Sequence, residues 1–341
     1  MRSPLALPTP GGALADVVKE EEGLSRNYNL GSRDMGRAGQ MALNSAAQSG
    51  AVSFGTAATN GERWGEFAEF ARQEMGVKYM EGVTSATVIA YGEKLQERVE
   101  AGEMSAATAQ NYVSAVNSVM KLATEGAWRS ISPTKSCGID QRSAIASENK
   151  AISSEKHAEL TSGGISERLS AIMDLQRSMG LRFEESAKLD AGKALEQAKE
   201  TGRVSIEAGT KGGLEREVPA SPAAVAALER AAAIQGADRS MIPAKNSYKD
   251  FQRAAYQELR EAGGSGFHGE RHAFAQERYL ELTGASAPVV EGWSREERFE
   301  RMAEALGVSR DEAKAIDESA RQQVAEELGH GRMEITNAYL G

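Results

Sequence analysis

The chain has 341 residues, of which 40% are hydrophobic and 26% charged, with a formal net charge of −9, so it is long enough for two domains that each bury a core. It contains no run of about 18 apolar residues, the length that crosses a membrane, and its first residues lack the apolar core of a secretory signal. The single Cys137 excludes an internal disulfide and a CxxC metal or redox site, and a cytosolic compartment is therefore expected.

The acidic net charge counts against nucleic-acid binding, because proteins that bind nucleic acid usually carry a basic surplus. The acidic residues are unevenly spread, however. Between Glu291 and Glu327 there are eleven acids and six bases, a difference of −5 that makes up over half of the total. Binding to phosphate requires a basic face at the contact rather than a basic average.

Residues 1–50 are rich in Gly, Ala and Ser and predict an N-terminal extension. Residues 33–48 are compatible with a short helix, but no partner for it can be named from the sequence. The preferred interpretation is therefore a loosely ordered extension. An arm that contacts DNA or a neighbouring subunit is the alternative.

Residues 51–135 show helical periodicity without a strand pattern, which predicts a small all-helical domain. A first helix is expected after Asn60 as its N-cap and up to Gly76, a second after residues 84–85, and a third from near Ser105. The apolar residues of each helix recur on one side, so the default interpretation is that they form the core of the domain.

Residues 136–152 lose this periodicity and gather Ser, Gly and both signs of charge, which predicts a linker to a second domain at 153–341. That domain starts with a helix that ends at Gly180. A β-hairpin follows, because two short β-patterned runs flank a glycine-rich turn. The strands are expected at 204–207 and 215–218, the turn at 209–213, and two later helices at 222–234 and 246–262. The predicted fold class is therefore mainly α with a small β-hairpin, an α+β arrangement.

Four short motifs in the second domain contain residues suited to phosphate chemistry. They are Gly180-Leu181-Arg182 with Glu185 after it, Thr210-Lys211 in the hairpin turn, His268-Gly269-Glu270-Arg271-His272, and Leu328-Gly329-His330 followed by Tyr339. In this order they resemble the signature of the tyrosine recombinases, the phage-integrase family. The resemblance covers the second domain and, less closely, the helical domain, which is similar to the family's core-binding (SAM-like) DNA-binding domain.

The resemblance implies a set of catalytic residues. Four of them would hold the scissile phosphate: Arg182, His268, Arg271 and His330. Lys211 would protonate the 5′-oxygen that leaves, and Tyr339 would attack as the nucleophile. Arginine suits the non-bridging oxygens because its planar fork donates two hydrogen bonds and stays protonated. A tyrosine hydroxyl ordinarily ionises only near about pH 10, so adjacent cations are needed to favour the phenolate.

Two further residues receive supporting roles. Glu185 occupies the acidic position that follows the first arginine of the family pattern, and His272 is interpreted as a core residue or as support for the catalytic residues. Outside a motif, an arginine at a helix start is usually a surface charge and a lysine in a turn is usually solvated. The assignments of Arg182 and Lys211 therefore depend on their neighbours.

The sequence departs from the family pattern in three places. Glu270 stands where the family usually has Leu, which implies either altered packing or a nearby basic partner. Residues 284–320 lengthen the interval between Arg271 and His330, and their pattern predicts one or two amphipathic helices, as a solvated insertion or as a subunit contact. The sequence stops at Gly341, where many relatives carry a further helix, so we expect the insertion or the N-terminal arm to join protomers.

The resemblance predicts site-specific DNA recombination through a 3′-phosphotyrosyl intermediate and a Holliday junction, for integration or excision of a phage or mobile element. It implies no cofactor and no metal. The expected partners are a double-stranded recombination site and a homotetramer on it, with a second recombinase or an accessory DNA-bending protein as further candidates, at the nucleoid of a bacterial cytoplasm and away from membranes. Two alternatives stay open: a type IB topoisomerase that relaxes one duplex, and a non-catalytic DNA-binding protein on a recombinase scaffold.

Overall fold

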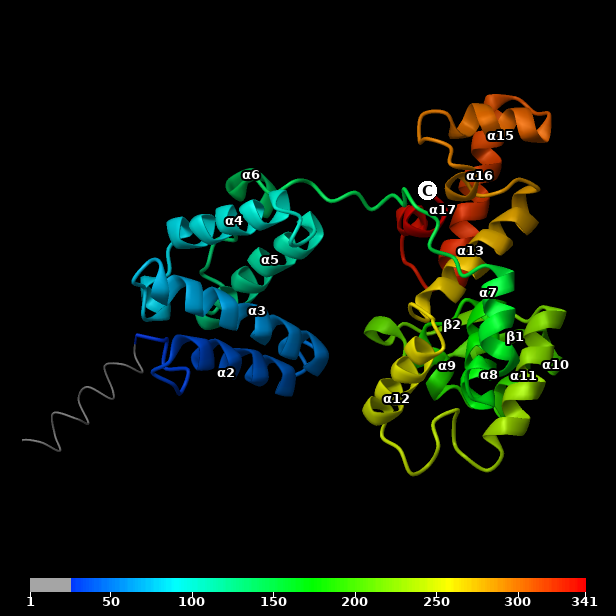
Figure 1. Ribbon diagram of the computed structural model, residues 1–341, viewed down its shortest axis with the longest axis horizontal. Helices are drawn as coiled ribbons and strands as arrows, with labels where there is room; N and C mark the ends of the chain where they lie inside the picture. The colour runs from blue at the N-terminus through cyan, green and yellow to red at the C-terminus, as the bar shows by residue number, and fades with distance from the viewer. Residues whose placement is uncertain (1–25) are drawn as a thin grey trace, which may run out of the picture. The chain divides into compact units, whose positions relative to one another are not determined.

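The structure, a computed structural model, describes residues 26–341 (Figure 1). By its internal contacts the chain divides into two compact units, Met1–Arg142 and Ser143–Gly341. Residues 1–25 of the predicted N-terminal extension lie outside the described residues. Within the described part, no helix is long and apolar enough to cross a membrane.

The first unit is helical, and several of its helices begin after a Ser or Thr cap. Ser53, Thr84 and Ser105 each accept a hydrogen bond from the backbone N–H three residues on, which pairs one of the donors that a helix start leaves free. Because Ser53 is the cap, the first predicted helix begins at Phe54 rather than after Asn60. The elements are α2 (Met35–Gln48), α3 (Phe54–Gln73), η1 (Met80–Gly82), α4 (Ser85–Glu100), α5 (Ala106–Ala123) and α6 (Pro133–Cys137).

The helix α2 packs against α3, so this segment belongs to the helical unit and is not a loosely ordered extension. Met35 and Leu43 are fully buried, and the indole Nε1 of Trp64 donates a hydrogen bond to the Met35 carbonyl oxygen at 3.0 Å. A Cβ at Gly39 would lie 2.1 Å from that nitrogen. The small residues that suggested disorder by composition are those that let the two helices approach closely.

The second unit is mainly helical with one two-stranded antiparallel sheet, which confirms the predicted fold class. Its strands are β1 (Arg203–Ile206) and β2 (Arg216–Pro219), paired with Ile206 opposite Arg216. Gly180 ends α8 in the left-handed conformation, with φ of 63°, which glycine adopts without strain. The other elements are α7 (Ser154–Glu159), η2 (Leu160–Gly164), α8 (Glu167–Met179), α9 (Phe183–Lys188), α10 (Ala191–Thr201), η3 (Lys211–Gly213), α11 (Pro222–Gln235), α12 (Tyr248–Glu261), α13 (His268–Thr283), α14 (Pro288–Glu291), α15 (Arg298–Leu306), α16 (Arg310–Glu327), η4 (Met333–Thr336) and α17 (Asn337–Leu340).

The second unit has two apolar clusters. One lies around α8, α10 and α11, and the other joins α13, α15, α16 and α17, of which α13 and α16 lie side by side (Figure 1). Met302, Ala313 and Ala320 are buried in the second cluster together with Tyr339. The amphipathic helices predicted for 284–320 are therefore confirmed. The segment contributes to the core that contains Tyr339 and is not a solvated surface insertion.

Candidate active site

A buried carboxylate, Glu185, organises the first part of the site. Arg182 is the N-cap of α9, and Glu185 is the third residue of that helix. Oε2 of Glu185 accepts the backbone N–H of Arg182 at 2.7 Å, and Oε1 accepts its Nη1 at 2.7 Å. Burial raises the pKa of Glu185, but the hydrogen bonds and charges of Arg216 and Arg182 outweigh burial and lower this pKa to about 2. Glu185 is thus ionised at neutral pH.

Arg216 is a member of the site that sequence reasoning missed. Its Nη1 and Nη2 donate to the two oxygens of Glu185, each at 2.8 Å, and its Nε donates to the carbonyl oxygen of Glu327 at 2.8 Å. A Cβ at Gly329 would lie 2.8 Å from Cδ of Arg216, so the glycine leaves room for this side chain. The available signal was strand alternation, because Arg216 lies on the same face of β2 as the buried Val218.

Arg271 connects the separate parts of the site. It lies on α13 with its side chain fully buried, and its Nη1 and Nη2 donate to the carbonyl oxygens of Gly180 and Leu328. Nη2 also lies 3.3 Å from Nε2 of His330, and Nε donates to the hydroxyl of Tyr339 at 3.3 Å. Burial lowers the pKa of Arg271 to about 10, so the guanidinium remains charged at neutral pH.

Tyr339 lies on α17 with 5% of its surface exposed. Its ring is surrounded by imidazoles, with centroid distances of 4.7 Å to His272, 5.7 Å to His330 and 5.8 Å to His268. Gln276 donates to its backbone carbonyl oxygen at 3.1 Å. The hydroxyl thus accepts a hydrogen bond from the permanent cation Arg271.

The histidines around Tyr339 are neutral at pH 7. Burial, followed by the charges of nearby arginines that include Arg271, lowers the pKa of His330 to about 4. Burial and neighbouring cationic groups lower the pKa of His272 to about 4, and desolvation with the charge of Arg271 lowers that of His268. Because arginine only donates, Nε2 of His330 accepts from Arg271, which places the remaining proton on Nδ1.

Comparison with known proteins gives a family match over part of the chain. Residues 138–277 match the model of the integrase family, and that range contains the first four predicted catalytic residues, Arg182, Lys211, His268 and Arg271. The matched residues are less than half of the chain, and over them the chain is similar to the integrase family.

The chain has no match among the curated proteins. Its fold is similar to that of the Tn1549 transposon integrase solved with transposon right end DNA, at 12% identity and a TM-score of 0.50, over 89% of this chain and 95% of that one. The same integrase with a circular intermediate DNA matches at 13% identity and 0.50, over 89% and 95%. A lambda integrase dimer bound to a COC' core site matches at 13% and 0.49, over 86% and 94%.

The unusual Glu270 has basic partners, which is one of the two possibilities that the sequence left open. The side chain is fully buried, and its oxygens meet Nδ1 of His157 at 2.9 Å and Nη1 of Arg177 at 3.1 Å. Nε2 of His157 lies 3.1 Å from Asp174, and the hydrogen bonds to Asp174 and Glu270 raise the pKa of His157 to about 9. The expectation of a nearby basic partner is confirmed, and the contact joins α13 to α7 and α8.

Lys211 is the predicted residue that the structure does not bring into this network. It lies at the exposed tip of the hairpin, in η3, and makes no hydrogen bond or ion pair with the described residues. The contacts do bring together Arg182, Glu185, Arg271, His330 and Tyr339, with His268 and His272 against the tyrosine ring.

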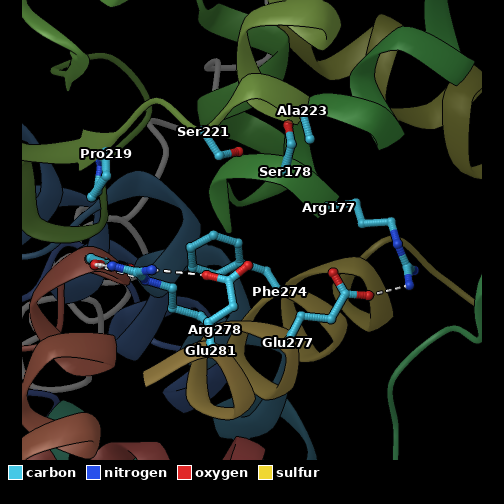
Figure 2. A pocket seen from close by; sticks show the side chains of 10 residues that line it. Arg177, Ser178, Pro219, Ser221, Ala223, Phe274, Glu277, Arg278 and Glu281 are labelled. Carbon is cyan, nitrogen blue, oxygen red and sulfur yellow. Dashed lines mark hydrogen bonds and ion pairs between the residues drawn. The ribbon is translucent and has the colours of Figure 1, made fainter. Parts of the chain in front are cut away.

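A pocket of this chain is lined by a different set of residues (Figure 2). Its charged groups are already paired. Arg177 contacts Glu277 at 2.6 Å, and Arg278 contacts Glu281 at 2.9 Å and Glu327 at 3.0 Å. The lining residues are Arg177, Ser178, Pro219, Ser221, Ala223, Phe274, Glu277, Arg278, Glu281 and Glu327. None of the six predicted catalytic residues lines this pocket.

Proposed function

We propose that this chain is a tyrosine-type site-specific recombinase, which cleaves DNA by attack of the phenolic oxygen of Tyr339 on the scissile phosphate. The bond from phosphorus to that oxygen forms while the P–O5′ bond breaks, which leaves a 3′-phosphotyrosyl ester and a free 5′-hydroxyl. The observation that carries the proposal is the 3.3 Å contact from Nε of Arg271 to the Tyr339 hydroxyl. This contact places a buried, permanently charged group beside the oxygen that attacks.

A surplus of positive charge supports phosphate binding at the same place. Arg182, Arg216 and Arg271 all contact the one carboxylate of Glu185, within 3.9 Å in the longest case. Arg182 donates to Glu185 only through Nη1, so its other side-chain donors are open among the described contacts, and 22% of its side chain is exposed. These donors and Nδ1 of His330 suit the non-bridging oxygens, where positioned charge usually contributes most to catalysis.

The proton transfers are assigned to the two exposed members of the predicted set. Lys211 gives a proton to the 5′-oxygen as it leaves, and His268 takes the phenolic proton, because its lowered pKa keeps the imidazole neutral at pH 7. No metal ion or nucleotide enters this scheme, since the ester to Tyr339 conserves the bond energy of the phosphodiester.

Rejoining reverses the same steps and becomes recombination when the attacking 5′-hydroxyl belongs to a second duplex. Sequential exchange of this kind passes through a Holliday junction and uses four protomers. The Tn1549 integrase structures contain transposon right end DNA and a circular intermediate DNA, which supports double-stranded DNA of a mobile element as the substrate here. We assign Arg182, Lys211, His268, Arg271, His330 and Tyr339 as the catalytic residues, with Glu185 and His272 in support.

The test uses nicked duplexes cut from the DNA that flanks the gene, so that cleavage releases a short fragment and the intermediate persists. We expect an SDS-resistant protein–DNA adduct with the native chain and with Tyr256→Phe, a partly exposed control tyrosine, and none with Tyr339→Phe. An adduct in Tyr339→Phe, or tight binding of the native chain without any adduct, would contradict the proposal.

A companion assay separates recombination from DNA relaxation. Two differently labelled duplexes with the cleaved site are incubated with the native chain, and exchanged strands are expected between them. Relaxation of a supercoiled plasmid without such exchange would favour the type IB topoisomerase alternative.

A further inference from the structure

Tyr339, the proposed nucleophile, lies on a helix that is too short to be stable in isolation. The helix α17 spans only Asn337–Leu340, and one helical turn is far below the length at which an isolated helix is stable in water. Its position must therefore come from tertiary contacts. These contacts decide where the phenolic oxygen of Tyr339 lies relative to Arg271.

One buried arginine holds both ends of this helix. Nη1 of Arg321 donates to Oδ1 of Asn337 at 2.9 Å, and Nη2 donates to the carbonyl oxygen of Gly341 at 2.8 Å. Asn337 and Gly341 flank Tyr339 on either side. Because the guanidinium is planar and rigid, it sets the spacing of its two acceptors.

The same arginine is oriented by Asp317, one turn earlier on α16. Nε of Arg321 donates to both oxygens of Asp317, at 2.8 and 3.0 Å, and 2% and 1% of the two side chains are exposed. The hydroxyl of Tyr279 donates to the same carboxylate at 2.7 Å. Tyr279 lies on α13, the helix that also carries Arg271. The helix α13 thus carries both Arg271, which contacts the Tyr339 hydroxyl, and Tyr279, which binds the carboxylate that orients Arg321.

We propose that Arg321, held by Asp317, is a positioning residue for the Tyr339 nucleophile. This inference rests on the proposed function. Each nitrogen of the guanidinium already donates to an acceptor within the protein, so Arg321 is not a phosphate ligand. It acts by keeping α17, and with it the phenolic oxygen, in line with the phosphate. Asp317 lies in the segment 284–320, which gives that segment a part in placing the nucleophile.

The test compares Arg321→Lys with Arg298→Lys. The lysine at 321 keeps a cation beside Asp317 but cannot reach both ends of α17. Arg298, on α15, is the matched control, because its side chain lies 3.9 Å from the same Asp317 carboxylate. Among the described contacts it makes no hydrogen bond to α17. Adduct formation is measured in single turnover with excess protein, together with the Kd for the same duplex and the Tm.

We expect the rate to fall about 10²-fold in Arg321→Lys, with Kd and Tm close to those of Arg298→Lys, which keeps the native rate. A duplex with sulfur at the bridging 5′ position provides a second readout, because a thiolate leaves without a proton. It should restore cleavage to Lys211→Ala but not to Arg321→Lys. An unchanged rate in Arg321→Lys, or restoration by sulfur, would overturn the positioning role.

A measurement without catalysis separates this inference from the proposed function. With 3-fluorotyrosine at position 339, the ¹⁹F signal is expected to shift or broaden in Arg321→Lys and to stay unchanged in Arg298→Lys. An unchanged signal in Arg321→Lys overturns the inference even if the native chain cleaves DNA. A failure of the native chain to form the adduct would count against the proposed function alone.

Discussion

Two buried carboxylates, Glu185 and Asp317, serve the same site in different ways. Both side chains are almost fully buried and both bind an arginine through two oxygens. Around Glu185 three arginines share one carboxylate, and Arg182 keeps open donors and partial exposure. At Asp317 the bound arginine, Arg321, uses all its nitrogens within the protein. Surplus charge suits an incoming anion, whereas a saturated pair suits the placement of backbone.

This difference also answers the objection raised by the net charge of −9. The acidic surplus between Glu291 and Glu327 includes side chains that are paired inside the protein, such as Asp317 and Glu327. Around Glu185, three arginines share one carboxylate, so the local charge is positive. Local excess and average charge are therefore independent quantities in this chain.

The largest effect is expected from Glu185→Ala, which leaves the buried guanidinium groups without their carboxylate. We expect the free energy of unfolding to fall by about 3–5 kcal/mol, measured by urea denaturation at pH 7. The neighbouring Glu184→Ala is the control, because Glu184 forms a partly exposed pair with Lys188 and should change stability by less than about 1 kcal/mol. Equal losses in the two variants would contradict the assigned role of Glu185.

The next largest effect is expected from acid, which removes the contribution of Glu185. The folded-state pKa of Glu185 is lowered to about 2 from an ordinary 4.5, so its contribution is present above pH 4.5 and is lost as pH falls towards 2. The difference corresponds to about 3 kcal/mol. Urea denaturation of the native chain between pH 5.5 and about 2.5 should show this loss. The slope with pH should be shallower in Glu185→Gln, and equal slopes would refute the prediction.

A smaller loss is expected from Asp317→Asn, because the amide keeps an oxygen that accepts from Tyr279 or Arg321. We expect unfolding to become easier by about 2 kcal/mol, the range of a hydrogen bond to a charged group. Adduct formation should slow by more than this loss of stability accounts for, because α17 is no longer held in place. A variant that cleaves at the native rate would show that the Asp317 pair serves stability alone.

The smallest effect concerns a third buried carboxylate, Glu270, whose partner His157 is titratable. The pKa of His157 is raised from 6.5 to about 9. The stabilisation by its pairs with Glu270 and Asp174 is therefore complete below pH 6.5 and is lost as pH rises through 9. We expect about 1 kcal/mol, because Arg177 and Arg230 stay bound to the same two carboxylates. Denaturation at pH 7 and 9.5 checks this. Native and His157→Gln chains should differ in their response to pH, and identical responses would contradict it.

Much of the architecture could be predicted from the sequence because its signals are local. Thr84 and Ser105 mark helix starts as caps, and the glycine-rich turn marks the hairpin. The motif around Arg182 is also stabilised by a local contact, because Glu185 at the third position of the helix accepts the backbone N–H of the N-cap residue. The requirement for a basic partner near Glu270 could be stated without the structure, although the partner itself could not be named.

Other parts of the site could not be found this way. Arg216 was one charged residue in a short strand, and only the packing of β2 against the end of α16 brings it to Glu185. The small residues of α2 suggested disorder by composition, whereas the structure shows that Trp64 packs against this helix. The segment with Asp317 resembled a surface insertion, because amphipathic helices bury one face without indicating against what.

The sequence alone determined the helix periods, the caps, the hairpin and the order of the residue types that the proposed chemistry uses. These features depend on neighbours a few positions apart, where backbone geometry relates sequence to space directly. The tertiary structure decided which charged side chains meet, as when Arg271 reaches Tyr339 and Arg321 holds both ends of α17. Such contacts depend on the packing of helices that are distant in the chain. The role of a buried charged side chain can therefore be assigned only once its partners are known.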